Sequence, residues 1–495
     1  MPMKLRLVHL FFFGLIANCS SPLFAQIENS AYSATGRGGV GTTMLLDYQA
    51  LGVNPANIGI KKYEGKRFTL GFMEVSANTL LQGVKQSDIN YFVKGDLFKS
   101  DSLNYSGKLK GAQLLSGKAF GANVDVMPLG LAYNHDKIGG FAFSVRESIR
   151  YFMDFNQNFT NYAFNGALSN LFPQLITNNN DTVANDPNQY QNYYMNNGGI
   201  KAGYNANGIS VGRVLNNTSY KMSWTRDWSL GYGKKIIDID ERHALYAGIT
   251  VKYIQGFGYI DINAKDNKLT GVAAYMPALN QLDSLLKIPA RDAGQSYKSI
   301  GNGMGFDFGL TAKLFDNFRV GMSLINIGSI NYKSNVYNVR DTTYYSVAYS
   351  SDFLGGFDNV IKWDKRENIK VALPSQFRFG ASASLANKRI EVGVDMVKPL
   401  NKQPGNYNTT AYAIGGDFYV LRWLKLSTGT SWGGNFASTS EGYKTRVAIP
   451  FGIGIVTGQE GGFEFGIATR DVTTYFLNQI SPMYSMAIGL VRIRL

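Results

Sequence analysis

Residues 375–397 read SQFRFGASASLANKRIEVGVDMV, in which apolar side chains alternate with polar or small ones. The alternation stops at residues 386–389 and resumes at Ile390. Successive side chains of a β-strand point to opposite faces, so this period of two predicts strands rather than helices. The stretch therefore predicts two antiparallel strands joined by a tight hairpin.

A two-residue turn at Asn387-Lys388 fixes how the two strands pair. In that register Leu385 faces Ile390 and Ala381 faces Val394, so both apolar rows lie on one side of the ladder. A shift by one residue would place one row on the wrong face. The hairpin is therefore consistent in both its pattern and its register.

The same alternation recurs along the chain. It appears at residues 224–232, 245–253, 306–311, 447–455, 463–468 and 491–495, and the charged residues 234–243 are expected to form a turn between the first two of these strands. Alternation alone does not separate a soluble β-sandwich from a barrel. Strands of ~10 residues, opposing faces rich in Gly, Ser and Thr, and short turns alternating with long polar loops favour a transmembrane barrel.

Composition supports an all-β chain that is not a helical membrane protein. Hydrophobic residues make up 45% and charged residues only 17%, with 55 glycines, 30 tyrosines and 31 phenylalanines, which suits strands and aromatic girdles. Beyond residue 25 there is no apolar run of the ~20 residues that a spanning helix needs. Because only helices and closed barrels satisfy their backbone in lipid, a membrane-spanning chain of this kind must be a barrel.

The first residues predict export. Lys4 and Arg6 precede an apolar stretch over residues 7–17, and a cut after Ala25 makes residues 1–25 a signal peptide. Cys19 lies inside that segment, where lipid attachment is the alternative. The mature chain would then have no cysteine, which excludes disulfides, thiolate metal sites and cysteine nucleophiles.

The chain keeps a positive net charge after the signal peptide is removed. The formal net charge of +14 falls to +12 once Lys4 and Arg6 are removed. An exported chain seldom meets nucleic acid, so nucleic acid is not an expected partner. Attraction to phosphate-bearing outer-membrane lipid and plain solvation of lysines in turns are the two explanations left open.

Motifs for catalysis are weak. Gly36, Gly38, Gly39 and Gly41 match a dinucleotide fingerprint by letter, but no strand precedes them, and the lysine that a phosphate-binding loop needs is absent. We expect these glycines to allow an irregular path of the chain in a narrow lumen. The two histidines of the mature chain, His135 and His243, lie among turn residues. We therefore expect no catalytic residues, no metal, no cofactor and no enzyme activity.

The segment that follows those glycines is more informative. Asn54, Pro55 and Ala56 resemble the N-terminal hatch of the long-chain fatty-acid transporter family, outer-membrane barrels that pass hydrophobic molecules. Residues 321–328, 373–378 and 395–401 resemble related barrels, including the barrel accessory of type IX secretion and exported families of unknown function. The resemblance implies a plug at residues 26–60, inside an antiparallel barrel of about fourteen strands at residues 61–495, in the outer membrane of a Gram-negative bacterium.

Two long loops and one lumen pair complete the expectations. Residues 156–220, rich in Asn, Tyr and Gly, and residues 261–298, whose leucines 279, 282, 285 and 286 have helical spacing, are expected to be extracellular loops. The hairpin register puts Arg378 diagonal to Asp395, a separation of about 7–8 Å that long side chains bridge. This pair would either hold the plug or merely neutralise charge in the lumen.

Three functions follow from these expectations. The leading one is passive passage of small hydrophobic molecules through the barrel. The alternative is a non-transporting barrel that scaffolds secretion or surface attachment, with its loops offered to secretion-machinery or surface proteins. The third is a soluble secreted β-rich binding protein, in which the apolar rows would face each other across a dry interior.

Overall fold

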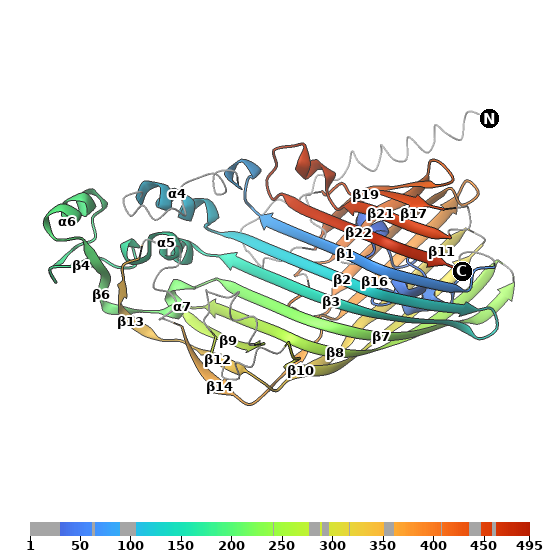
Figure 1. Ribbon diagram of the computed structural model, residues 1–495, viewed down its shortest axis with the longest axis horizontal. Helices are drawn as coiled ribbons and strands as arrows, with labels where there is room; N and C mark the ends of the chain where they lie inside the picture. Colours follow the sequence, from blue (N-terminus) through green and yellow to red (C-terminus); the bar gives the residue numbers. More distant parts are fainter. Residues whose placement is uncertain are drawn as a thin grey trace.

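The computed structural model describes residues 30–61, 65–89, 105–240, 242–276, 288–289, 297–315, 317–350, 361–406, 408–434, 447–457 and 462–495. Its main body is an antiparallel barrel with helices gathered at one end (Figure 1). The expected signal peptide, and the helix expected at the leucines 279–286, lie outside the described residues. Within the described residues, no helix is long and apolar enough to cross a membrane.

The barrel is closed by fourteen strands, the number that the resemblance to the transporter family implies. Each pairs antiparallel with the next, and the last pairs with the first. The strands are β1 (Phe68–Gln82), β2 (Lys118–His135), β3 (Gly139–Phe155), β7 (Ser219–Asp240), β8 (His243–Lys265), β10 (Gly301–Leu314), β11 (Phe318–Tyr332), β16 (Gln376–Leu385), β17 (Ile390–Pro399), β18 (Ala411–Tyr419), β19 (Leu424–Gly433), β20 (Phe451–Val456), β21 (Phe463–Thr469) and β22 (Met483–Arg494).

The β16–β17 hairpin has the predicted register, with Leu385 opposite Ile390 and Ala381 opposite Val394. The amide of Arg389 donates to the carbonyl of Ala386 at 3.2 Å, which closes the tight turn. Both central residues have positive φ, 54° at Asn387 and 65° at Lys388, the backbone that a twisted two-residue hairpin turn needs.

Apolar side chains of the strands face outward. The exposed ones include Phe72, Trp228, Leu230, Ile249, Phe306, Phe308, Leu310, Met322, Leu324, Phe379, Val394, Ile453, Phe465, Ile467 and Leu490. Polar and charged side chains on the opposite faces, such as Asp307, Thr311 and Ser427, are buried in the lumen. The apolar faces of the strands therefore point outward, as in transmembrane barrels. In a soluble β-sandwich these faces would pack against each other in the interior, so the structure argues against that fold.

The two ends of the barrel differ. We call the end where β1 begins and β22 finishes the base, and the opposite end the top. The base carries short turns, whereas the top carries β9 (Lys268–Tyr275), β12 (Val336–Arg340), β14 (Lys362–Arg366), β15 (Ile369–Ala372) and η8 (Val472–Tyr475). The expected turn at residues 234–243 is wrong, because β7 continues to Asp240 and β8 begins at His243. Backbone pairing between β7 and β8 continues through residues 234–240, although the side chains of this segment are exposed and charged residues interrupt its apolar row.

A folded cap, residues 105–117, 156–218 and 343–348, stands on the top. Its helices are α4 (Tyr105–Leu115), α5 (Gln157–Asn165), η4 (Gly166–Leu168), η5 (Pro187–Gln189), α6 (Tyr190–Asn196) and α7 (Val211–Val214). Its sheet has the order β13 (Thr343–Ala348), β6 (Ile200–Ser210), β4 (Gln174–Thr177) and β5 (Thr182–Ala184). The segment expected as a loop at 156–220 thus holds structure of its own, and the one expected at 261–298 contains the end of β8 and all of β9.

Candidate functional site

Residues 30–61 fill the lumen as a plug (Figure 1). The plug consists of α2 (Tyr32–Gly36), η1 (Asp47–Ala50), η2 (Pro55–Gly59) and the irregular chain between them. Nearly all of its side chains are buried. Gly38 and Gly39 have φ of 74° and 99°, so the chain turns there in a conformation that glycine adopts without strain.

Asn54 lies at the junction of plug and wall. Its side-chain amide donates to Thr311 Oγ1 at 2.9 Å and to the carbonyl of Thr42 at 3.0 Å, and its Oδ1 accepts from the amide of Ala56 at 3.2 Å. Pro55 follows as the first residue of η2, a position that needs no amide donor. The Asn-Pro-Ala segment therefore begins η2 and fastens the plug to β10.

Wall glycines bring the strands against the plug. A Cβ added at Gly309 would lie 2.0 Å from Asn54 Oδ1, and one at Gly248 would lie 2.3 Å from the carbonyl of Pro55. One added at Gly466 would lie 2.1 Å from the ring of Tyr32. Real side chains cannot approach so closely, so these positions admit only glycine while the plug is in place.

The carboxylate of Asp395 holds the glycine-rich turn of the plug. Its Oδ2 accepts from the amides of Gly41 and Thr42 at 3.0 and 2.9 Å and from Thr42 Oγ1 at 2.7 Å. Arg378 Nη2 lies 3.6 Å from the same oxygen, and both side chains are buried. Two strands away, a Cβ added at Gly36 would lie 2.8 Å from the Cβ of Ser427 on β19. We propose that Arg378 and Asp395 act as a latch on the plug, because the acceptor atom is shared between the ion pair and the plug backbone.

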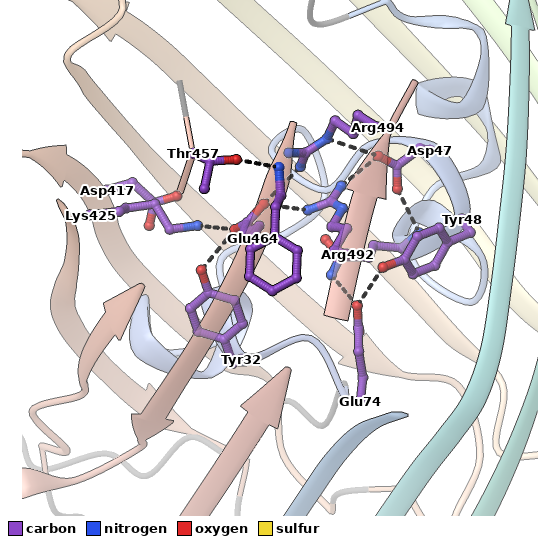
Figure 2. A network of polar contacts seen from close by, with 12 residues as sticks. Tyr32, Asp47, Tyr48, Glu74, Asp417, Lys425, Thr457, Glu464, Arg492 and Arg494 are labelled. Atoms are coloured by element: carbon purple, nitrogen blue, oxygen red, sulfur yellow. Dashed lines mark hydrogen bonds and ion pairs between the residues drawn. The ribbon is translucent and has the colours of Figure 1, made fainter. Parts of the chain in front are cut away.

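A buried network centred on Glu464 joins the first plug helix to three wall strands (Figure 2). Tyr32 donates to Glu464 Oε1 at 2.7 Å, Arg494 Nη2 lies 2.8 Å from Oε2, and Lys425 contacts the same carboxylate. The Lys425 ammonium also lies 4.8 Å from the centre of the Tyr32 ring. Arg492 Nη1 lies 3.3 Å from Oε2, so three cations and one phenol contact this carboxylate.

The second part of the plug is tied to β1 and β22 (Figure 2). Tyr48 and Gln49 donate to Glu74 Oε1 at 2.8 and 2.6 Å. Asp47 Oδ2 lies 2.5 Å from Arg492 Nη2. Tyr48, Leu51 and Ile58 of the plug also pack in one apolar cluster with Met127, Ala132 and Ala142 of the wall. Water can replace the partners of the hydrogen bonds and ion pairs if the plug moves, but not this apolar packing.

The wall is irregular at this level. The β1 ladder lacks a pair at Met73, which has φ of 55°, and the residue across from it on β2 is Pro128, which has no amide hydrogen. The β2–β3 register also shifts here, so that Met127 and Pro128 oppose Arg146 alone. The interruption lies in the apolar belt, because the neighbouring Phe72 is outward and exposed.

The predicted and the observed site residues overlap only in part. Five of the predicted residues lie against strands of the wall: Gly36, Gly41, Asn54, Pro55 and Ala56. Sequence reasoning missed Tyr32, Tyr48, Glu74, Lys425 and Glu464. The available signal was a charged residue on the lumen face of an alternating strand, as at Glu464 between Phe463 and Phe465. The two histidines are elsewhere, at the base, where His243 Nδ1 lies 2.9 Å from Asp240.

Alkaline pH is expected to loosen the plug. Burial, together with the facing carboxylate, raises the pKa of Tyr32 and of Tyr48 well above the ordinary value. A phenol in the unfolded chain ionises near pH ~10, so the stability that these protonated phenols contribute is complete below that pH. It is lost as the pH rises through the higher folded-state values. Other buried tyrosines also ionise late, so Tyr32→Phe and Tyr48→Phe should each remove one tyrosine from the late part of the tyrosinate absorbance titration of the unsubstituted protein.

These observations define the class of protein: an antiparallel β-barrel of fourteen strands closed around an N-terminal plug. The chain belongs to a family of unknown function (DUF5723), whose profile matches residues 63–457. No protein with a curated description matches the chain.

Three solved structures illustrate the similarity of fold. The toluene transporter TodX of P. putida has a TM-score of 0.44 and 11% identity, covering 95% of this chain and 99% of that chain. The toluene transporter TbuX of Ralstonia pickettii has 0.40 and 12%, covering 94% and 98%. A FadL homologue of Pseudomonas aeruginosa has 0.42 and 12%, covering 96% and 99%. At these identities the likeness describes the fold alone.

Proposed function

We propose that the protein is an outer-membrane channel of a Gram-negative bacterium that lets small hydrophobic molecules pass. The observation that carries this proposal is the position of Glu74. It accepts hydrogen bonds from Tyr48 and Gln49 of the plug, and it directly follows Met73, where the wall loses its pairing. Movement of the plug would therefore act on a point where the ladder of the wall is interrupted.

Residence in the outer membrane is supported by the outward apolar side chains and by the two different ends. In outer-membrane barrels, short turns face the periplasm and long loops face outside. The base then lies in the periplasm and the cap faces the exterior. The expected lipid partner would cover the apolar belt.

The solute class follows from the exit. A molecule that leaves beside Met73 and Pro128 enters hydrocarbon, where polar groups without partners are strongly disfavoured. Only apolar molecules gain from that route. The solute named for two of the similar barrels, toluene, is therefore a suitable probe.

A disulfide that ties the plug to the wall tests the proposal. The Cβ atoms of Gly36→Cys and Ser427→Cys would begin 2.8 Å apart, and a disulfide needs about 3.8 Å, so a shift of about 1 Å suffices. We expect the protein to raise toluene uptake by a Gram-negative host without such a channel. The oxidised double variant should lose this uptake and regain it in reductant, whereas the single variants should not respond to reductant.

Two results would contradict the proposal. Toluene uptake that does not depend on the protein would reject the channel, and uptake that survives the disulfide would reject the plug as its gate.

A scaffold function is the second candidate, and the cap is the observation that favours it. Leu168, Leu175, Tyr190, Tyr193 and Ile200 form a buried cluster within the cap, separate from the main core. A structured platform outside the membrane suits binding of secretion-machinery or surface proteins. Replacing residues 156–218 by a short turn should leave toluene uptake intact if the channel proposal is right, and should abolish surface attachment of a partner if the scaffold is right.

A further inference from the structure

A cavity of about 90 Å³ lies in the lumen on the top side of the plug. Its floor is Gly52 of the plug, and Arg146, Asp227 and Lys252 line one part of its wall. Apolar side chains line another part, among them Ile254, Ile330 and Leu373. The cavity is therefore polar on one side and apolar on the other.

A second cavity, of about 220 Å³, continues toward the top. It shares Arg150 and residues 403–405 with the first. Its other lining residues include Asp154, Lys221 and Asn263, which come from the top parts of their strands. A small polar molecule entering from the top would meet this cavity first and the one above Gly52 second.

Two charged side chains of the inner cavity, Arg146 and Asp227, have no hydrogen-bond or ion-pair partner among the described residues, although Arg146, Arg150 and Lys252 act on the Asp227 carboxylate from a distance. Arg146 and Asp227 face each other on β3 and β7. The Arg146 Nε and Asp227 Oδ1 atoms are buried. The neighbouring cation Lys252, in contrast, is satisfied, with Asp307 at 2.8 Å and Asn326 Oδ1 at 2.6 Å.

Opposite charges that share a cavity without touching indicate a bridging ligand. A buried charge without a partner is costly, and such groups in native proteins usually have one. An anion alone would satisfy Arg146 and repel Asp227, and a cation alone would do the reverse. A molecule that carries both charges satisfies both groups.

We infer that this cavity binds a small zwitterion, with its carboxylate on Arg146, its ammonium on Asp227 and an apolar side chain along Ile254, Ile330 and Leu373. Hydrophobic α-amino acids have this chemistry. The ligand would lie on the plug, because a Cβ added at Gly52 would be 3.2 Å from Arg146 Nη1. The inference goes beyond the proposed channel and does not depend on the exit route for apolar molecules.

Four probes that share an aromatic ring test the contribution of each ligand charge to binding: L-phenylalanine carries both charges, phenylacetate only the carboxylate, phenethylamine only the ammonium, and toluene neither. Binding is measured by calorimetry on the purified full-length protein in detergent. We expect L-phenylalanine to bind at least tenfold more tightly than each of the others. Arg146→Met should remove its advantage over phenethylamine, and Asp227→Asn should remove its advantage over phenylacetate.

Matched controls come from an exposed pair at the top of the barrel, Arg340 and Asp364. Arg340→Met and Asp364→Asn should leave all four affinities unchanged. Should Arg146→Met fail to fold, Asp227→Asn and the probe series with the unchanged protein still decide the question.

The inference is wrong if L-phenylalanine does not bind or binds no better than the single-charge probes, in which case water alone fills the cavity. That result would leave the channel proposal standing wherever toluene uptake persists. Tight binding of L-phenylalanine without toluene uptake would support the zwitterion site and reject the hydrophobic route.

Discussion

Replacing Gly309 by valine is expected to displace the plug and to raise the ion conductance of the barrel at least tenfold in planar lipid bilayers. The new Cβ would lie 2.0 Å from Asn54 Oδ1 and 2.9 Å from Pro55 Cδ. Valine suits a strand, so β10 should keep its ladder while the plug loses its position. Because Asn54 also donates to Thr311, two residues along β10, the fastening of the plug would be lost together with its space.

The matched control is Gly462→Val near the base. An added Cβ there meets nothing closer than 3.5 Å, so the plug and the conductance should be unchanged. A folded Gly309→Val barrel with the conductance of the unsubstituted protein would show that residues 30–61 do not close the lumen.

The wall could be predicted from sequence because its rules are local. Alternation over ten residues decides which side chains share a face, and one tight turn decides the register of a hairpin. That is why the pairing of Leu385 with Ile390 follows from residues 375–397 alone. Charge was a poorer guide, since β7 runs on through Lys235 and Asp238.

The attachment of the plug could not be predicted in the same way. Tyr32 meets Glu464, which is 432 positions away in the chain, and the meeting depends on the closure of the barrel and on how deep the plug lies. Alternation shows that Glu464 faces the lumen, but it does not show which plug residue reaches the same depth. The Asn-Pro-Ala segment could be identified as part of the plug only through its resemblance to the hatch of the transporter family.

Replacing Glu464 by glutamine is expected to have the largest effect on stability, a loss of about 3–5 kcal/mol in the free energy of unfolding. The side chains of Glu464 and Lys425 are each only 4% exposed, and Lys425 has no other carboxylate partner among the described residues. The amide keeps the shape but removes the negative charge on which Lys425 and Arg494 depend. Urea unfolding of the protein in detergent measures the loss.

The exposed Asp364→Asn is the control, because surface ion pairs contribute at most about 1 kcal/mol. A second variant identifies the cause. In Glu464→Gln/Lys425→Met the cation left without a partner is also removed, so part of the lost stability should return, whereas Arg492 and Arg494 keep Asp47 within 4.0 Å. If the double variant is no more stable than Glu464→Gln, the unpaired Lys425 is not the source of the penalty, and the network holds the plug through Tyr32 and the arginines instead.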